Sequence, residues 1–234
     1  MKADPVTWGI LLGGVHRLGS INPHGICTWG DGSECRDCEL NGRLNCRWER
    51  RMLIKFLAIV APFVAVGVPG MYMAGLITGG WGPQLLYAAF VVVFFTVLET
   101  RVLCRHCPFY SRGGSMLRCY ANHGLPKLWS FQSRPASLSE RATLVISFLV
   151  MAGAPILIEL NGLAVLHGPL QRQAYAGLTF ASALAVLGFF TFLGLYFCPR
   201  CVNFSCPFNR TPRELRRRYL ERNPVMGEAW SSLD

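Results

Sequence analysis

Four long apolar segments, separated by polar or cysteine-rich stretches, dominate the pattern of the chain. A helix needs about 20 mostly apolar residues to cross a bilayer core of about 30 Å. Buried helices of a soluble protein are the alternative, but four such runs in 234 residues favour a membrane protein. The predicted membrane-spanning helices are Phe56–Thr78, Leu85–Cys104, Ala142–Leu160 and Ala174–Cys198.

Short connections predict that the spans pair into two hairpins. The glycine-rich turn 79–83 joins the first pair, and a linker that begins at Asn161 and Gly162 joins the second. Prolines inside spans should kink them, with neighbouring helices satisfying the freed backbone groups. These prolines are Pro62, Pro69 and Pro155.

The basic residues predict the orientation of the spans. Of the 23 Lys and Arg residues, only Arg172 falls on the side of the two short connections. The positive-inside rule then places both termini and the central loop in the cytoplasm, as in a multi-pass protein of the inner membrane. The net charge of +10 fits this topology and attraction to anionic lipid, so no nucleic-acid partner is expected.

All ten cysteines lie outside the interior of the spans and share the predicted cytoplasmic side. Cytosolic thiols are kept reduced, so metal binding or redox chemistry is expected rather than a disulfide framework. A faint internal repeat supports two hairpins that run in the same direction. Cys104 and Cys107 close the first hairpin, and Cys198 and Cys201 close the second.

The predicted fold class is therefore all-α, a four-span transmembrane bundle of two parallel hairpins with a cytoplasmic, cysteine-rich, metal-binding cap. The chain divides into a cysteine-rich N-terminal segment (1–51), the first hairpin (52–104), a cysteine-rich loop (105–141), the second hairpin (142–198) and a cysteine-rich, basic, amphipathic tail (199–234).

Three cysteine sets are candidate metal ligands. The N-terminal set reads C-x7-C-x2-C-x7-C and has enough thiols for one zinc ion or one iron–sulfur cluster; surface thiols are the alternative. The loop set reads C-x2-C-x11-C-x3-H, close to zinc-finger spacing. The tail set, C-x2-C-x4-C, needs a fourth ligand from elsewhere. In order, the sets are Cys27, Cys35, Cys38 and Cys46; Cys104, Cys107, Cys119 and His123; and Cys198, Cys201 and Cys206.

Proline follows cysteine at positions 107–108, 198–199 and 206–207. Bacterial ferredoxin runs end in C-x3-C-P. In segments 104–109 and 198–208 the chain resembles the membrane polyferredoxin subunits that pass electrons between quinol and periplasmic nitrate or nitrous oxide reductases, although its spacings are C-x2-C-P and C-x4-C-P. The resemblance implies cytoplasmic iron–sulfur centres and exchange of electrons with a quinone.

Ionisable residues in spans are costly and mark candidate functional groups. Glu99, near the cytoplasmic end of the second span, is either an interfacial partner of an arginine or a catalytic proton acceptor beside a quinone headgroup. Glu159 lies near the opposite face and is expected to cap the third span, with proton entry or exit as the alternative. His106 is expected to support the ligands or to lie on the surface.

The tail is expected to form an amphipathic helix over 212–222, with a capping box that begins at Thr211 and an apolar stripe of Leu215 and Tyr219. Such a helix would lie on anionic lipid or dock an acidic protein partner.

These patterns predict an integral membrane metal-binding protein. The leading hypothesis is an iron–sulfur electron-transfer subunit or anchor of a membrane oxidoreductase, linked to a quinone, with partner subunits at the cytoplasmic face. The alternative is a zinc-stabilised scaffold or assembly factor without redox activity.

Overall fold

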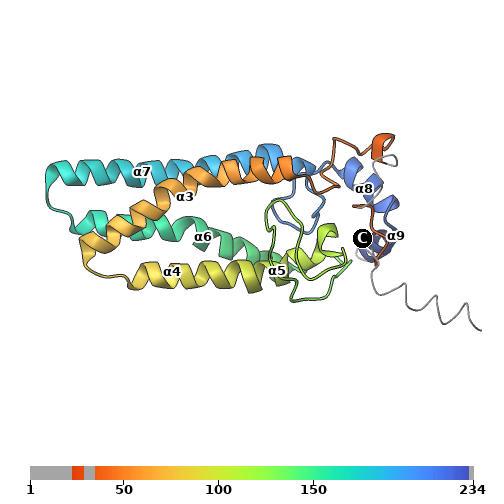
Figure 1. Cartoon of the computed structure of the whole chain (residues 1–234), viewed down its shortest axis with the longest axis horizontal. Coiled ribbons are helices and arrows are strands. Elements are labelled where there is room, and N and C mark those ends of the chain that lie inside the picture. Colours follow the sequence, from red (N-terminus) through yellow and green to blue (C-terminus); the bar gives the residue numbers. More distant parts are fainter. Residues whose placement is uncertain (1–22, 29–34, 232–234) are drawn as a thin grey trace, which may run out of the picture.

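The computed structural model describes residues 23–28 and 35–231, and helices are labelled as in Figure 1. These residues form helices and no β-strand. The helical elements are α3 (Arg50–Thr78), α4 (Gly82–Val93), η2 (Phe94–Leu98), α5 (Glu99–Val102), η3 (Cys104–His106), η4 (Pro108–Tyr110), α6 (Leu138–Val165), α7 (Pro169–Phe192), η5 (Leu193–Phe197), η6 (Cys198–Arg200), α8 (Arg213–Glu221) and α9 (Pro224–Ser231).

Four continuous helical stretches are long and apolar enough to cross a membrane, which indicates a multi-pass membrane protein. They lie side by side, and the loop between α5 and α6 gathers with α8 and α9 at one end (Figure 1). The predicted all-α class and the four spans are confirmed. The stretches are Arg50–Thr78, Gly82–His106, Leu138–Val165 and Pro169–Arg200.

The third span is longer than predicted. α6 continues through Asn161 and Gly162 to Val165, so the expected linker at these residues is wrong. It begins one turn early as well, because Ser137 and Glu140 form a capping box that nucleates the helix before the apolar run. Glu159 therefore lies inside a helix and does not cap its end.

α3 packs mainly against α6 and α7, rather than against α4, its neighbour in the chain. Small residues allow this close approach. A Cβ added at Gly162 of α6 would lie 3.1 Å from the Cα of Ala74 in α3, and Ala74 itself is buried. Pro69 lies inside α3 near this contact. The contact between helices that are distant in sequence therefore sets the arrangement of the bundle.

The described residues outside the spans at the end that carries α8 and α9 (23–28, 35–49, 107–137 and 201–231) form a cap with its own apolar core. Tyr219 of α8 is fully buried and packs edge-on against Phe204, with ring centroids 5.4 Å apart. Leu215 and Met226 are buried in the same core. The apolar stripe of α8 therefore faces the cap, and the prediction that it lies on lipid is wrong.

The predicted capping box of α8 is also wrong. Pro212 occupies the N-cap position, and no side chain caps the helix. The Thr211 hydroxyl instead donates to the carbonyl oxygens of Cys201, at 2.9 Å, and of Cys198, at 3.4 Å. The start of α8 is thus tied to the cysteine turn that ends the fourth span.

The cap core predicts a large effect for truncation at Tyr219. Within the described residues its hydroxyl has no hydrogen-bond partner, so the stabilisation comes from the ring. Tyr219→Ala should lower the free energy of unfolding of the cap by about 3 to 5 kcal/mol, whereas Tyr219→Phe should leave it unchanged or raise it slightly. Denaturant unfolding in detergent, followed by tryptophan fluorescence, measures both; equal losses in the two variants would contradict the assignment.

Candidate functional site: a cysteine-lined cavity between bundle and cap

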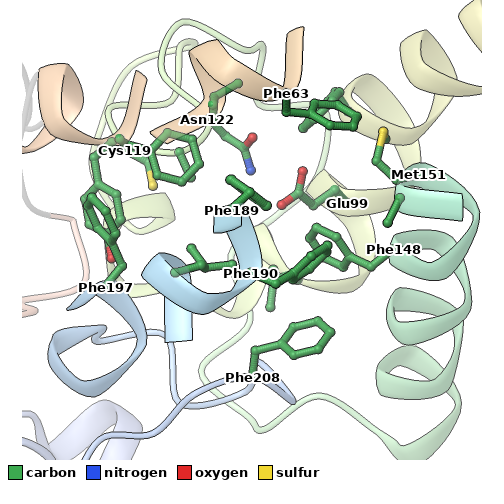
Figure 2. Close-up of a pocket in the computed structure, with 18 of the residues that line it drawn as sticks. Phe63, Glu99, Cys119, Asn122, Phe148, Met151, Phe189, Phe190, Phe197 and Phe208 are labelled. Carbon is green, nitrogen blue, oxygen red and sulfur yellow. The ribbon is translucent and has the colours of Figure 1, made fainter. Parts of the chain in front are cut away.

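A cavity of about 460 Å³ lies where the four spans meet the cap. Its wall is mostly apolar and rich in aromatic rings (Figure 2). Deep apolar pockets with a few polar groups are the usual form of small-molecule sites. The rings come from the spans and from the tail, and include Phe56, Phe63, Phe95, Phe148, Phe189, Phe190, Phe197 and Phe208.

Six of the ten cysteines line this cavity. The structure thereby joins the three cysteines of the loop set to the three of the tail set, which the sequence treats as separate. The Cys107 thiol is close enough to feel the charges of Cys119, Cys201 and Cys206. The six are Cys104, Cys107, Cys119, Cys198, Cys201 and Cys206.

The two C-x2-C pairs adopt similar backbone turns. Each begins with a short 3₁₀ helix, η3 or η6, directly after the end of a span. The N–H of Cys107 donates to the carbonyl of Cys104 at 2.9 Å, and the N–H of Cys201 donates to that of Cys198 at 3.4 Å. A π-helical turn precedes each pair, η2 in one span and η5 in the other, and such turns are frequent at functional sites.

Glu99 and Asn122 supply polar groups to the apolar cavity. Both are buried, and their side chains point into the hollow (Figure 2). The Asn122 amide donates to the sulfur of Cys104 at 3.2 Å and also hydrogen-bonds the Glu99 carboxyl. Within the described residues, Glu99 Oε2 has no partner. One carboxyl oxygen is thus held beside the thiols, and the other is available to a ligand.

The arginines near Glu99 are engaged elsewhere. The guanidinium of Arg101 lies 4.7 Å from the ring centroid of Trp129, and Arg105 donates to Glu140 at 2.5 Å. Among the described residues, no ion pair involves Glu99. The expected alternative of an interfacial ion pair is therefore not what this structure contains.

The histidines lie apart from the cavity. His123 is exposed and stacks on Trp48 with ring centroids 5.1 Å apart, so it does not join the three loop cysteines in the cavity wall. His106 is buried: its Nδ1 lies 2.9 Å from the carbonyl oxygen of Arg134, and its Nε2 lies 3.3 Å from Glu140. His106 thus holds the Cys104–Cys107 turn against the start of α6.

The N-terminal cysteine set forms a second thiol group in the cap. Burial and then the charges of Cys27, Cys38 and Cys35 raise the pKa of Cys46 to about 12. This set lies close to the cavity because the N–H of Asn45 donates to the carbonyl of Arg200 at 2.8 Å. Part of the predicted knuckle, residues 29–34, lies outside the described residues.

The donor chemistry of these groups fits thiolate-bound metal, although no formed coordination sphere is present. Across 23–28 and 35–231, no three Cys, His, Asp or Glu side chains are arranged to hold an ion. No disulfide joins any of the ten cysteines, all of which lie in those residues. Burial raises the pKa of the Cys201 thiol, to whose sulfur the Tyr120 hydroxyl donates. Ligation would have to remove the thiol protons and rotate the side chains inward.

Sequence reasoning missed Asn122, Tyr120 and the aromatic lining. Asn122 directly precedes His123, and Tyr120 directly follows Cys119, so closeness to candidate ligands was the available signal. That signal cannot tell which neighbour of a ligand faces the site.

Comparison of the chain with protein-family models, curated proteins and solved structures gives no significant match. The function is therefore inferred from the residues and their geometry.

The environment of Cys119 predicts slow alkylation. Burial is the main cause that raises the pKa of this thiol from 9.0 to about 11. In reduced, chelator-treated protein its thiolate fraction at pH 8 should be about 100-fold below that of an ordinary cysteine, because only the thiolate reacts. Iodoacetamide labelling followed by mass spectrometry should show a rate that rises until about pH 11, with urea-unfolded protein as the control. A plateau by pH 9 in the folded protein would contradict this environment.

Proposed function

We propose that this protein is a membrane electron-transfer subunit in which the six cavity cysteines hold an iron–sulfur cluster and a quinone binds in the rest of the cavity. The observation that carries the proposal is the convergence of cysteines from two distant segments on one aromatic cavity that also contains a buried carboxyl. Each part alone has an ordinary structural explanation; their combination in one site is typical of redox chemistry in a membrane.

The composition of the donor set favours iron over zinc in the cavity. All six candidate ligands are sulfur, and iron–sulfur clusters are held by four cysteine thiolates. The histidine that would complete a zinc-finger set is outside the cavity wall, on Trp48. A bound cluster would supply one-electron transfer. Asn122, which donates to Cys104, would provide a hydrogen bond to a ligand sulfur and so tune the centre.

The shape and chemistry of the remaining cavity suit a quinone. Its wall extends from the cysteines into the bundle as far as Gly67, Met71 and Tyr87. A flat ring with an apolar tail matches such a wall of aromatic and aliphatic side chains. The free oxygen of Glu99 faces the same space, where it would take a proton from a quinol hydroxyl or return one to a quinone.

The topology is part of the proposal. We assign the cap and both termini to the cytoplasmic face of an inner membrane, with the spans as two parallel hairpins, from the distribution of basic residues. The Cys-Pro motifs of the polyferredoxin resemblance then lie at the cavity. Partner subunits of an oxidoreductase would dock on the cap.

A zinc-stabilised scaffold is the second candidate, and the N-terminal cysteine set favours it. Its four thiols lie near one another in the cap, and the N–H of Cys27 donates to Asn223 at 2.6 Å, beside α8. A structural zinc at this position would fold the cap onto the tail and would supply no redox chemistry.

Metal analysis of single-cysteine variants separates the two candidates. Anaerobically purified protein should be brown and contain iron, and Cys201→Ser should abolish its electron paramagnetic resonance signal after reduction. His123→Ala, which removes a residue outside the cavity wall, should keep that signal. A colourless protein whose stoichiometric zinc is lost in Cys38→Ser would favour the scaffold. A folded protein with neither metal would refute both.

The role of Glu99 predicts a specific kinetic defect. Glu99→Gln removes the proton acceptor but keeps the size of the side chain, so quinol-linked turnover should fall about 100-fold or more. Iron content should remain unchanged. Arg101→Gln, two residues away and stacked outside on Trp129, is the matched control and should retain turnover. Full activity in Glu99→Gln would leave this carboxyl without a catalytic role.

A further inference from the structure

A second buried carboxyl lies deep in the bundle, apart from the cysteines. Glu159 of α6 is 0% exposed, between α3 and α7. The Ser182 hydroxyl of α7 donates to its Oε1 at 2.9 Å. Its Oε2 is buried and has no hydrogen-bond partner within the described residues. Glu159 therefore has the same pattern as Glu99, with one oxygen held and the other unpaired.

The backbone of α3 is shaped to receive this carboxyl. A Cβ built on Gly70 would lie 2.2 Å from Glu159 Oε1 and 2.5 Å from its carboxyl carbon, so no residue larger than glycine fits there without a shift of the glutamate. The Tyr175 hydroxyl donates to the carbonyl of Gly70 at 2.9 Å and fixes the helix at this point. The carboxyl thus occupies a built cradle.

The position of Glu159 places it within the apolar layer. It lies six residues before the end of α6 at Val165, which is about 9 Å along the helix axis. Gly70 precedes the end of α3 by eight residues, or about 12 Å. The carboxyl is thus well inside the bundle, near the end opposite the cap.

The surroundings of Glu159 contain no counterion. Within the described residues no cation forms an ion pair with it. The titratable group that faces it from α7 is the phenol of Tyr175; α3 contributes the backbone of Gly70, and Arg172 near the start of α7 is exposed. An unpaired carboxylate in such a site costs several kcal/mol, so the group is held as the neutral acid.

The cavity reaches the edge of this cradle. Gly67 and Met71 flank Gly70 on α3, and both line the cavity wall, as do Met151 and Ala152 of α6. We propose that Glu159 is an intramembrane proton-binding site that exchanges its proton through the deep end of the cavity. This inference requires neither metal nor quinone, and so it stands apart from the proposed function.

Infrared spectroscopy of the full chain in lipid vesicles tests this inference. At neutral pH a band of a protonated carboxylic acid should be present, and Glu159→Gln should remove it, whereas Glu99→Gln should leave it. Transfer to D₂O should shift the band to lower frequency. If Glu159→Gln does not fold, Ser182→Ala serves instead, because loss of the donor should shift the same band without removing it.

The route through the cavity is tested by the rate of this exchange. Ala152→Phe fills the deep end and should slow deuterium exchange of the band about tenfold or more, since exchange would then require local opening. Leu149→Phe, on the exposed face of the same helix, is the matched control and should leave the rate unchanged. Absence of the band, a band that never shifts in D₂O, or equal rates in both variants would overturn the proposal.

Discussion

Close packing of α3 against α6 and α7 is the constraint on which the rest of the structure depends. Small residues at Gly70, Ala74 and Gly162 let these helices approach until their backbones are nearly in contact. In a membrane, lipid is as apolar as the side chains, so van der Waals contact between small residues is what holds spans together. This contact leaves Glu159 enclosed at one end and positions the helices that surround the cavity at the other.

Bundle and cap form the cavity together. The returning spans end in similar π-helical and 3₁₀ turns, which place two C-x2-C pairs on one wall. The cap holds these turns through backbone contacts: Asn203 donates to the carbonyl of Leu103 at 3.3 Å, and Asn209 donates to that of Cys201 at 2.8 Å. Because polar groups buried beside a membrane must find partners, these bonds limit how the thiols can lie.

Two buried carboxyls, at opposite ends of the bundle, give the interior its chemical character. Glu99 shares the cavity with the thiols, and Glu159 lies against the backbone of α3 beyond its deep end. Each has one oxygen that a neutral side chain holds and one without a partner among the described residues. Groups of this kind are expensive in a bilayer and persist where they serve protons or ligands. Exchange of electrons with a quinone and exchange of protons within the membrane are therefore compatible roles for one interior.

The sequence by itself determined the all-α class and the four spans, because length and hydropathy alone decide whether a helix can cross a membrane. It also identified the cysteines and Glu99 as the groups with chemistry to offer. Only the tertiary structure decided that loop and tail cysteines share one cavity, that His123 lies outside the cavity wall, and that Glu159 is enclosed by Gly70. These outcomes depend on contacts between helices far apart in the chain, and the spacing of residues along one segment carries no information about such contacts.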